Sequence, residues 1–414
     1  MEGKGKHILY INQYFKQPNE PGITRSYWIA KELINRGYTI TMLAHRNTML
    51  KQVGDVPKVE KTVVDGIEVI YIRNEYSNDM GIYKRAVSFV KFMLASAYYA
   101  NKMKNVDLVI ATSTPLTVAF PALIRNRFKK TPFIFEVRDL WPEVPIQMGA
   151  IKNKFAVKFL KWFEKTTYLR SEHVIALSPG MQEGVVKYIP ESNTTMIPNM
   201  AKIDKFWRRP INEDLFSEFG FDKNSFKAIY FGTLGQANGL DYIMDAIFLL
   251  DNAKESNLEF IFLGDGKIKN DLIKKSATLQ YVKVTFVERQ PMDIVSEILN
   301  ACDVSIVTFS DIPILTTNSP NKLFDTLSAG KPSIVNSAGW TKDIVEKGNA
   351  GFYVNPSKAS ELAEKILVLK NNPELSKSMG ESARKLAETT YDKSVLCAEF
   401  ADVVDDVMAK ISKK

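Results

Sequence analysis

The residue types that could do chemistry gather in one segment, Ser319–Val335. Its pattern predicts a loop followed by a helix, with Ser319 as N-cap and Pro320 at the first helical position. Lys322 lies in the first turn, and Asp325 follows one turn later on the same face. Free N–H groups and a nearby lysine attract phosphate, while a carboxylate accepts hydrogen bonds from sugar hydroxyls. The segment therefore indicates a nucleotide-sugar site, although an ordinary capped helix of an α/β domain would fit the pattern equally well.

Short apolar strands alternate with helices along the whole chain, which predicts an α/β fold of two doubly wound parallel sheets. The break near 199–212 is polar and basic. We therefore expect an N-terminal domain (1–200), a second domain (201–390) and a C-terminal helix (391–414) that packs back on the first. Ligands bind at the carboxyl ends of the strands in such sheets. Two domains facing a central cleft would suit a reaction between two separately bound substrates.

The predicted strands of the first half are 7–15, 39–45, 67–73, 108–113, 133–139, 174–178 and 195–198. Those of the second half are 228–232, 259–263, 284–287, 304–309 and 332–336.

The charge of this 414-residue chain is unevenly distributed. Residues 1–200 hold 28 Lys and Arg against 17 Asp and Glu, whereas the rest holds 27 against 30. Such asymmetry points to a polyanionic partner for the first half. No nucleic-acid recognition motif accompanies the charge, so an anionic membrane is favoured over nucleic acid. Cys302 and Cys397 are expected to be buried, reduced thiols.

No secretory signal or membrane span is expected. Residues 1–7 lead directly into a predicted strand, and the longest apolar window, 86–100, is interrupted by Lys91. Two basic, aromatic helices, 83–104 and 151–170, instead suit the surface of an anionic membrane. The alternative is that their apolar stripes pack against a sheet while the lysines are solvated, and both can hold at once.

Nearly end to end, the chain resembles the retaining glycosyltransferases of family 4, whose GT-B fold contains two Rossmann-like domains. The matching segments are 20–24, 36–43, 174–178, 197–199, 264–266 and 319–335. Segment 136–143 resembles more narrowly the N-acetyl-fucosamine transferases of O-antigen and capsule assembly. Those enzymes add a sugar to a polyprenyl-diphosphate-linked acceptor at the cytoplasmic face of the membrane.

The resemblance implies a retaining hexosyl- or N-acetylaminosugar transferase in cell-surface polysaccharide biosynthesis. Its donor would be a UDP-linked N-acetylated or deoxy sugar and its acceptor a polyprenyl-diphosphate-linked saccharide. The nucleotide sugar is then a substrate, and neither a metal nor another cofactor is expected. The protein would be cytoplasmic and peripheral on the inner face of the cytoplasmic membrane.

This sequence departs from the family at four positions. The family's two glutamates, eight positions apart, fall on Thr317 and Asp325. Its Arg and Lys, which grip the donor diphosphate, fall on Thr233 and Asn238. Asp325 can still hold ribose hydroxyls, whereas the diphosphate must be neutralised by Lys322, Arg289, helix N-termini and backbone amides.

The resemblance also assigns the remaining site residues. The glycine-rich turn 232–239 would let backbone amides approach the diphosphate, and Gly264 and Gly266 would border the base or sugar. The whole donor-binding set is Gly22, Gly232, Thr233, Leu234, Gly264, Gly266, Arg289, Asn318, Ser319, Asn321, Lys322, Leu323 and Asp325.

The acceptor-binding candidates are Arg138, Asp139 and Glu143; alternatively, Arg138 and Asp139 form a structural ion pair under Trp141. In retaining transfer the departing diphosphate can itself take the acceptor proton. The catalytic candidates Asp139, Lys322 and Asp325 are therefore expected to position and stabilise.

Two other functions compete with this one. A nucleotide-sugar epimerase of related fold needs titratable groups near the donor's C2, and the second half offers few histidines or paired carboxylates. A non-catalytic two-domain protein that binds anionic surfaces is the other alternative. His7, His45 and His173 lack the spacing of zinc ligands.

Overall fold

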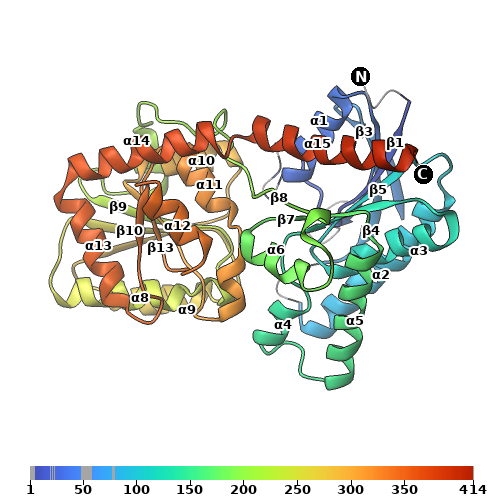
Figure 1. The fold of residues 1–414 in the computed structure, drawn as a ribbon. Helices are drawn as coiled ribbons and strands as arrows, with labels where there is room; N and C mark the ends of the chain where they lie inside the picture. The colour runs from blue at the N-terminus through green and yellow to red at the C-terminus, as the bar shows by residue number, and fades with distance from the viewer. Residues whose placement is uncertain are drawn as a thin grey trace. The chain divides into compact units, whose positions relative to one another are not determined.

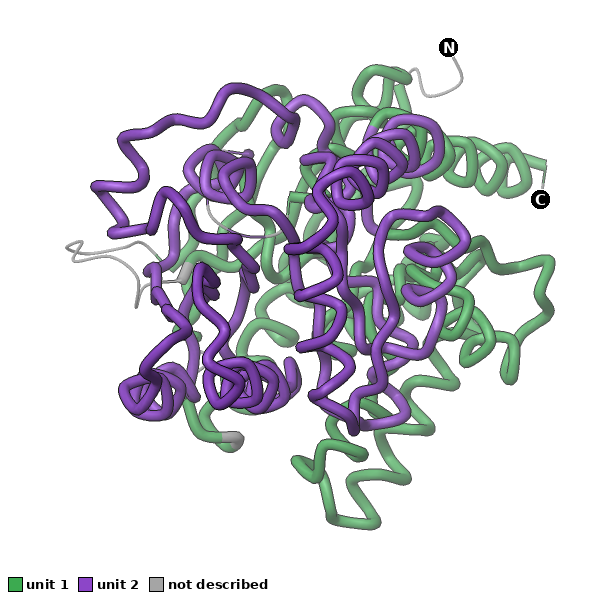
Figure 2. The backbone as a smooth tube through the Cα atoms, turned by 90° about the vertical axis from the view of Figure 1, so that its left-hand side faces the viewer, with its two compact units in different colours: residues 1–17, 23–198, 394–414 green, residues 18–22, 199–393 purple. Residues whose placement is uncertain are grey.

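The structure, a computed structural model, describes residues 5–18, 20, 22, 24–47, 58–76 and 80–413, and for Asn47 and Ile82 only the backbone. The chain forms two compact units (Figure 2). Unit 1 comprises residues 1–17, 23–198 and 394–414, and unit 2 comprises 18–22 and 199–393. The chain thus passes into unit 2 after Pro198 and returns after Lys393. Helices cover the sheet of each unit (Figure 1).

Unit 1 is built on an eight-stranded sheet, counted over the described residues, with the order β3-β4-β2-β1-β5-β6-β7-β8. The strands are β1 His7–Ile11, β2 Thr39–Asn47, β3 Val59–Val64, β4 Ile67–Asn74, β5 Leu108–Thr112, β6 Phe133–Val137, β7 His173–Ala176 and β8 Thr194–Met196. Its helices are α1 Arg25–Asn35, α2 Ile82–Lys102, α3 Ala119–Lys129, α4 Glu143–Gln147, α5 Lys154–Arg170, α6 Pro179–Val186 and α15 Lys393–Ser412.

The prediction of a purely parallel first sheet was wrong at one edge. Strand β3 pairs antiparallel with β4, whereas the other pairs in this sheet are parallel. β3 mixes valines with Glu60 and Lys61 and has no fully buried residue, so it lacks the apolar run by which the buried strands were recognised. An antiparallel edge strand on an otherwise parallel sheet is common.

A buried ion pair ties the strand ends of unit 1 together. Glu136 of β6 is fully buried, and its Oε1 lies 2.7 Å from Nε of Arg25, which is 2% exposed. Thr112 donates to the other carboxylate oxygen over 2.8 Å. The Arg25 guanidinium also donates to the carbonyl oxygens of Ile197, at 3.0 Å, and Pro198. One side-chain cluster therefore joins the start of α1, two central strands and the last residues of unit 1 before the chain leaves it.

The C-terminal helix α15 is held to the start of the chain. The Arg36 guanidinium lies 2.6 Å from carboxylate oxygens of both Asp402 and Asp405. The Tyr38 hydroxyl donates to Asp405 over 2.5 Å. These contacts make residues 394–414 part of unit 1, although they follow unit 2 in sequence.

Unit 2 contains a parallel, six-stranded sheet among its described residues, with the order β11-β10-β9-β12-β13-β14. The strands are β9 Phe226–Phe231, β10 Leu258–Leu263, β11 Lys283–Val287, β12 Val304–Val307, β13 Ser333–Val335 and β14 Gly351–Tyr353. Its helices are α7 Asp214–Phe219, α8 Leu240–Asn252, α9 Lys269–Ser276, α10 Met292–Ala301, α11 Asn321–Ser328, α12 Trp340–Lys347, α13 Ala359–Asn371 and α14 Pro373–Thr389.

The strand order of unit 2 changes direction between β9 and β12, which makes their carboxyl ends the expected ligand position. α8 and α13 contribute apolar side chains to one core cluster, and α11, α12 and α14 contribute theirs to another. Both faces of the sheet are thus covered, as the apolar strand sequences require. Sequence analysis missed the strand β14, whose sequence Gly-Phe-Tyr begins with a glycine and contains no β-branched residue.

Both cysteines, Cys302 and Cys397, are buried free thiols, as expected. Within the described ranges, no helix combines the length and the hydrophobicity needed to cross a bilayer.

Removing the cation from the buried pair should destabilise unit 1. Arg25→Met leaves the Glu136 carboxylate buried without a counter-charge, and we expect a loss of about 3–5 kcal/mol in the free energy of unfolding. Calorimetric melting measures it as a lowered transition. The matched control is Lys6→Met, which removes the exposed pair with Asp107 and should cost less than about 1 kcal/mol. Equal effects of the two substitutions would contradict the role given to Arg25.

Candidate active site

The site is built around the start of α11, which begins one residue after Pro320. Ser319 is not its side-chain cap, so that prediction was wrong: the Ser319 hydroxyl oxygen instead accepts a hydrogen bond from the Asn199 N–H at 3.2 Å. Within the described residues, the N–H groups of Asn321 and Lys322 have no partner. This end of α11 therefore presents unpaired donors and the positive end of the helix dipole.

Lys322 is a partly buried lysine without a carboxylate partner in the described part of the chain. Its Nζ lies 3.8 Å from the centroid of the Tyr230 ring. Desolvation lowers the pKa of Lys322 to about 7, because burial disfavours the ammonium form. An anion placed beside Nζ would restore the charge.

Gly232, at the end of β9, makes room for this lysine. Its φ is 133°, and a Cβ added there would lie 3.3 Å from Lys322 Nζ. The backbone conformation therefore favours a glycine, and a side chain there would also crowd the end of the lysine. The resemblance to the family singled out both residues, and the structure brings them into contact.

Some of the backbone amides at the ends of β9 and β10 are engaged already. The N–H groups of Gly232, Leu234 and Gly264 donate to Leu263, Asp265 and Val287 respectively, each over 2.9 Å. These three amides continue the ladder of the sheet and are not available to a diphosphate. The N–H groups of Thr233 and Gly235 make no backbone hydrogen bond within the described residues, so the approach of this turn to a diphosphate stays a prediction. An anion at this edge of the sheet would meet Lys322 and the start of α11.

Other residues of the turn shape it from within. The Tyr230 hydroxyl and the Asn238 amide both donate to the Thr233 carbonyl oxygen over 2.9 Å. A Cβ at Gly264 would lie 1.9 Å from the Gly232 carbonyl oxygen, and one at Gly266 would lie 2.4 Å from that of Leu234. The two glycines thus allow close approach of neighbouring backbones.

Asp325 is buried, and its Oδ1 lies 2.7 Å from Nζ of Lys202. Burial raises the pKa of Asp325, and the Lys202 ammonium opposes that rise. Lys202 is itself only 6% exposed. Sequence analysis placed Lys202 in a polar linker and missed its ion pair with Asp325. A local sequence pattern does not indicate a partner so far along the chain.

The loop before α11 is fixed by two more residues that sequence analysis gave no role. The Asn199 side chain donates to the Ser319 carbonyl oxygen over 2.5 Å, and the Trp340 indole donates to that of Asn318 over 2.9 Å. Thr317, which replaces the family's first glutamate, donates to the Ile314 carbonyl oxygen over 2.8 Å. Its hydroxyl therefore supports the loop.

The remaining donor candidates lie less centrally. The side chains of Leu234 and Leu323 are fully buried in the cores, so both residues support the site from behind. Arg289 is exposed and follows β11, the edge strand, and no contact in the described residues joins it to Lys322. Gly22 has a φ of 135°, and its neighbours Pro21 and Ile23 lie outside the described residues.

The acceptor candidates Arg138 and Asp139 follow β6 in unit 1 and are partly buried. The Thr114 hydroxyl donates to Asp139 over 3.0 Å, and burial raises the pKa of Asp139. Burial lowers the pKa of Arg138, whose guanidinium has no hydrogen bond or ion pair with any described residue. The alternative of a structural Arg138–Asp139 ion pair is therefore not realised.

Glu143 turns toward α5. Its Oε2 lies 3.4 Å from Lys161 Nζ, and its Oε1 accepts from the Gln147 amide over 2.9 Å. The hydrogen bond from Gln147 and the Lys161 charge lower the pKa of Glu143. No contact in the described residues joins it to Arg138 or Asp139.

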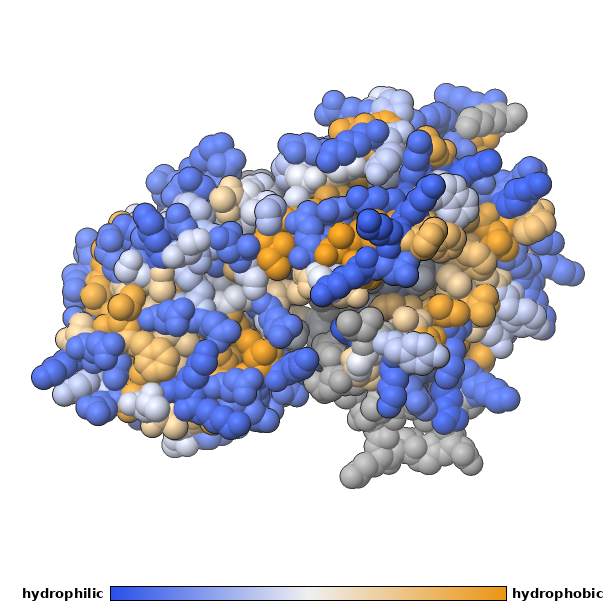
Figure 3. Space-filling model, turned by 90° about the horizontal axis from the view of Figure 1, so that it is seen from below, coloured by the Kyte–Doolittle hydropathy of each residue, from blue (hydrophilic) through white to orange (hydrophobic). Residues whose placement is uncertain are grey.

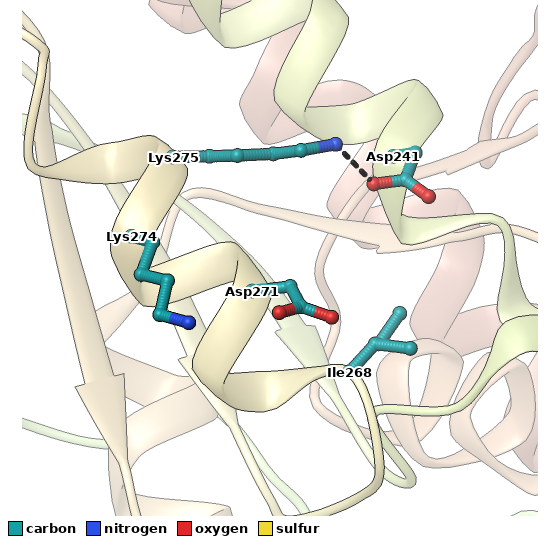
Figure 4. A pocket seen from close by; sticks show the side chains of 5 residues that line it. All are labelled: Asp241, Ile268, Asp271, Lys274 and Lys275. Carbon is teal, nitrogen blue, oxygen red and sulfur yellow. Dashed lines mark hydrogen bonds and ion pairs between the residues drawn. The ribbon is translucent and has the colours of Figure 1, made fainter.

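A hollow of about 390 Å³ lies elsewhere on unit 2, between the start of α8 and one side of α9. Figure 4 shows Lys275 reaching across to Asp241, with 2.7 Å between Nζ and Oδ1. Asp271, Lys274 and Ile268 complete its lining. Its exposed charges of opposite sign form a solvated surface, in contrast to the buried groups near α11. No cluster of His, Cys, Asp and Glu that could bind a metal occurs in the described ranges.

Two protein families match the chain in consecutive segments. Residues 22–200 match "Glycosyl transferase 4-like domain", and residues 211–386 match "Glycosyl transferases group 1". The boundary between the matches falls just after Pro198, where the chain enters unit 2.

Curated relatives agree with these matches. The probable glycosyltransferase WbjE of Pseudomonas aeruginosa is 22% identical over 77% of this chain and 79% of its own. The UDP-Gal:α-D-GlcNAc-diphosphoundecaprenol α-1,3-galactosyltransferase of Escherichia coli is 26% identical over 65% of this chain and 68% of its own.

Solved structures share the fold at low sequence identity. Sucrose-phosphate synthase from Thermosynechococcus elongatus superposes with a TM-score of 0.76 at 15% identity, covering 98% of this chain and 100% of that one. Anabaena HepE in complex with UDP and glucose gives 0.70 at 18% identity, covering 97% and 100%. With two Rossmann-like units and a glycosyltransferase domain matched in each, the chain is a glycosyltransferase of the GT-B fold.

Proposed function

We propose that this glycosyltransferase moves a sugar from a UDP-sugar donor to a polyprenyl-diphosphate-linked saccharide, with retention of configuration. The sugar would be N-acetylated or deoxy, the product a cell-surface polysaccharide such as an O-antigen or capsule. The reaction would need no metal ion. The protein would work at the inner face of the cytoplasmic membrane.

The observation that carries the donor half is the unpaired Lys322 beside Gly232, with Asp325 one helical turn away. A diphosphate supplies the anion that this lysine and the start of α11 lack. The Asp325 carboxylate offers an acceptor for ribose hydroxyls. Solved structures of HepE contain UDP and UDP-glucose, which supports a uridine nucleotide here.

Support for the acceptor half comes from Arg138 and Asp139. An unpaired, partly buried guanidinium suits bidentate binding of a phosphate. The Asp139 carboxylate, held by Thr114, could orient the acceptor hydroxyl. The galactosyltransferase relative acts, by its name, on a GlcNAc-diphosphoundecaprenol acceptor.

Retention fits this arrangement because the site offers positioned charges. The leaving diphosphate would take the proton of the attacking hydroxyl on the same face of the sugar. Lys322 would stabilise the negative charge that develops on that diphosphate. In this proposal Lys322, Asp325 and Asp139 act by binding and orientation.

Membrane attachment is supported by the outer face of α5. Its buried residues are Phe163, Glu164, Thr167 and Tyr168, so the core contact is made by another face. A stripe of Phe155, Phe159 and Trp162 is exposed by 86%, 59% and 57%. Exposed lysines precede each of these aromatics, at Lys154, Lys158 and Lys161. An apolar stripe bordered by lysines suits the headgroup region of an anionic bilayer.

Helix α2 repeats this design. Tyr83, Val87, Val90, Leu94 and Tyr98 are exposed at helical spacing, while Ser88, Phe92 and Ala97 face the core. Figure 3 shows hydrophobic side chains, in orange, among hydrophilic ones, in blue, on the surface of unit 1. Both helices thus expose apolar side chains that do not pack against the core. This favours binding to a membrane surface over a purely structural role for these helices.

Binding of UDP tests the donor site. Lys322→Ala and Asp325→Ala should each weaken the affinity about tenfold or more, because each removes a hydrogen bond to or from a charged group worth about 1.5–3 kcal/mol. Isothermal titration measures the change. The control Lys275→Ala alters the hollow between α8 and α9 and should leave the affinity unchanged. If only Lys275→Ala loses affinity for UDP, the nucleotide binds in that hollow and the proposed site at α11 is wrong.

The affinity for UDP should also depend on pH through Lys322. Its pKa of about 7 means that the free site is protonated below pH 7, and the bound anion raises that pKa. The affinity should therefore be level just below pH 7 and fall up to about tenfold per pH unit above it. Lys322→Arg keeps its charge and should abolish the decline. A wild-type affinity that stays constant from pH 7 to 9 would refute this.

Removing the aromatic stripe should release the protein from vesicles. Phe155→Ser, Phe159→Ser and Trp162→Ser combined should abolish sedimentation with vesicles of phosphatidylglycerol and phosphatidylcholine. The control, Ile273→Ser with Tyr281→Ser, removes exposed apolar groups of unit 2 and should sediment normally. If both variants sediment equally, α5 is not the membrane contact.

A further inference from the structure

A buried lysine stands directly behind the carboxylate of Asp325. Lys202 Nζ lies 2.7 Å from Asp325 Oδ1, and the two residues are 6% and 8% exposed. Oδ1 is buried and has no partner besides this ion pair, and no described residue forms a hydrogen bond with the second carboxylate oxygen, Oδ2. One oxygen is thus committed to the lysine, and the other is open to a ligand.

Lys202 is itself held in place by its backbone surroundings. The neighbouring Ala201 N–H donates to Tyr391 over 2.7 Å, and the Ala201 carbonyl oxygen accepts from the Lys393 N–H over 3.0 Å. Asn199 adds its bonds to Ser319, just before α11. The segment that leads into unit 2 is therefore anchored on both sides, and Lys202 approaches Asp325 from a fixed backbone.

We propose that Lys202 is a positioning residue of the donor site: it orients Asp325 and keeps it ionised, so that Oδ2 accepts ribose hydroxyls. This inference rests on the proposed use of a UDP-sugar donor. A second role, as a direct ligand of the substrate, is not needed, since the ammonium group already faces Asp325 and the ring of Phe206 at 5.5 Å.

The electrostatics of the pair explain why the lysine is needed. Burial alone favours the protonated, neutral form of a carboxyl group, and a neighbouring cation reverses this preference. Lys202 is the cation that lowers the pKa of Asp325 against the effect of burial. A neutral carboxyl would present a hydroxyl proton in place of one acceptor and would lose the stronger, charge-assisted hydrogen bonds to ribose.

The test compares UDP with 2′-deoxy-UDP, which lacks one ribose hydroxyl. Wild type should bind the deoxy nucleotide about tenfold more weakly. Lys202→Met should reduce this ratio to near one, and the ratio should recover as the pH rises from 6 to 9 and the carboxyl ionises. The titration of Lys322 affects both nucleotides equally and cancels in the ratio. Lys202→Arg should retain the discrimination, and Lys205→Met, which alters a partly exposed neighbour, should not change it.

Each outcome bears on one claim. Discrimination preserved in Lys202→Met overturns the role of Lys202 while leaving the donor site intact. Absence of discrimination in wild type that still binds UDP overturns the contact between Asp325 and ribose, and with it this inference. Failure of wild type to bind UDP overturns the proposed donor as well. If Lys202→Met does not fold, the double variant Lys202→Met with Asp325→Asn removes the uncompensated charge, and it must show no discrimination at any pH.

Discussion

Cations in partly dry surroundings that form no ion pair or hydrogen bond with a described carboxylate shape both candidate sites of this enzyme. Lys322 lies in the first turn of α11 in unit 2, and Arg138 directly follows β6 in unit 1. Burial lowers the pKa of both side chains. Keeping such a group charged costs free energy, which a bound anion offsets. The proposed donor and the proposed acceptor each carry a diphosphate, so either would supply the anion that its cation lacks.

The folded structure leaves Lys322 and Arg138 without a carboxylate, among the described residues, that forms an ion pair with them. Carboxylates elsewhere in the two units are committed: Glu136 to Arg25 and Asp325 to Lys202, both across buried distances of 2.7 Å. Tyr230 offers Lys322 only its ring face, which attracts a cation without neutralising it. The glycines at the ends of β9 and β10 then let the backbones pack closely enough to leave the lysine at the surface of the site.

Much of the fold could be predicted from sequence, because buried parallel strands are continuous apolar runs between helices. The same rule explains the omissions: β3 is half-exposed and charged, and β14 begins with a glycine and has no β-branched residue. The location of Lys322 and Asp325 on one helical face was also predictable, since it needs only local periodicity. The pairing of Asp325 with Lys202 was not, because it joins segments whose contact is set by tertiary structure. The engaged amides of Gly232 and Gly264 were missed for the same reason: a glycine-rich turn has the same sequence whether its N–H groups point to a ligand or to the next strand.

The most direct measurement of the central claim is an experimental structure of the enzyme with UDP bound. The account predicts the diphosphate within hydrogen-bond distance of Lys322 Nζ and the start of α11, and the ribose hydroxyls on Asp325 Oδ2 with Lys202 still paired to Oδ1. A diphosphate bound away from Lys322, or a ribose that leaves Asp325 without contact, would contradict it.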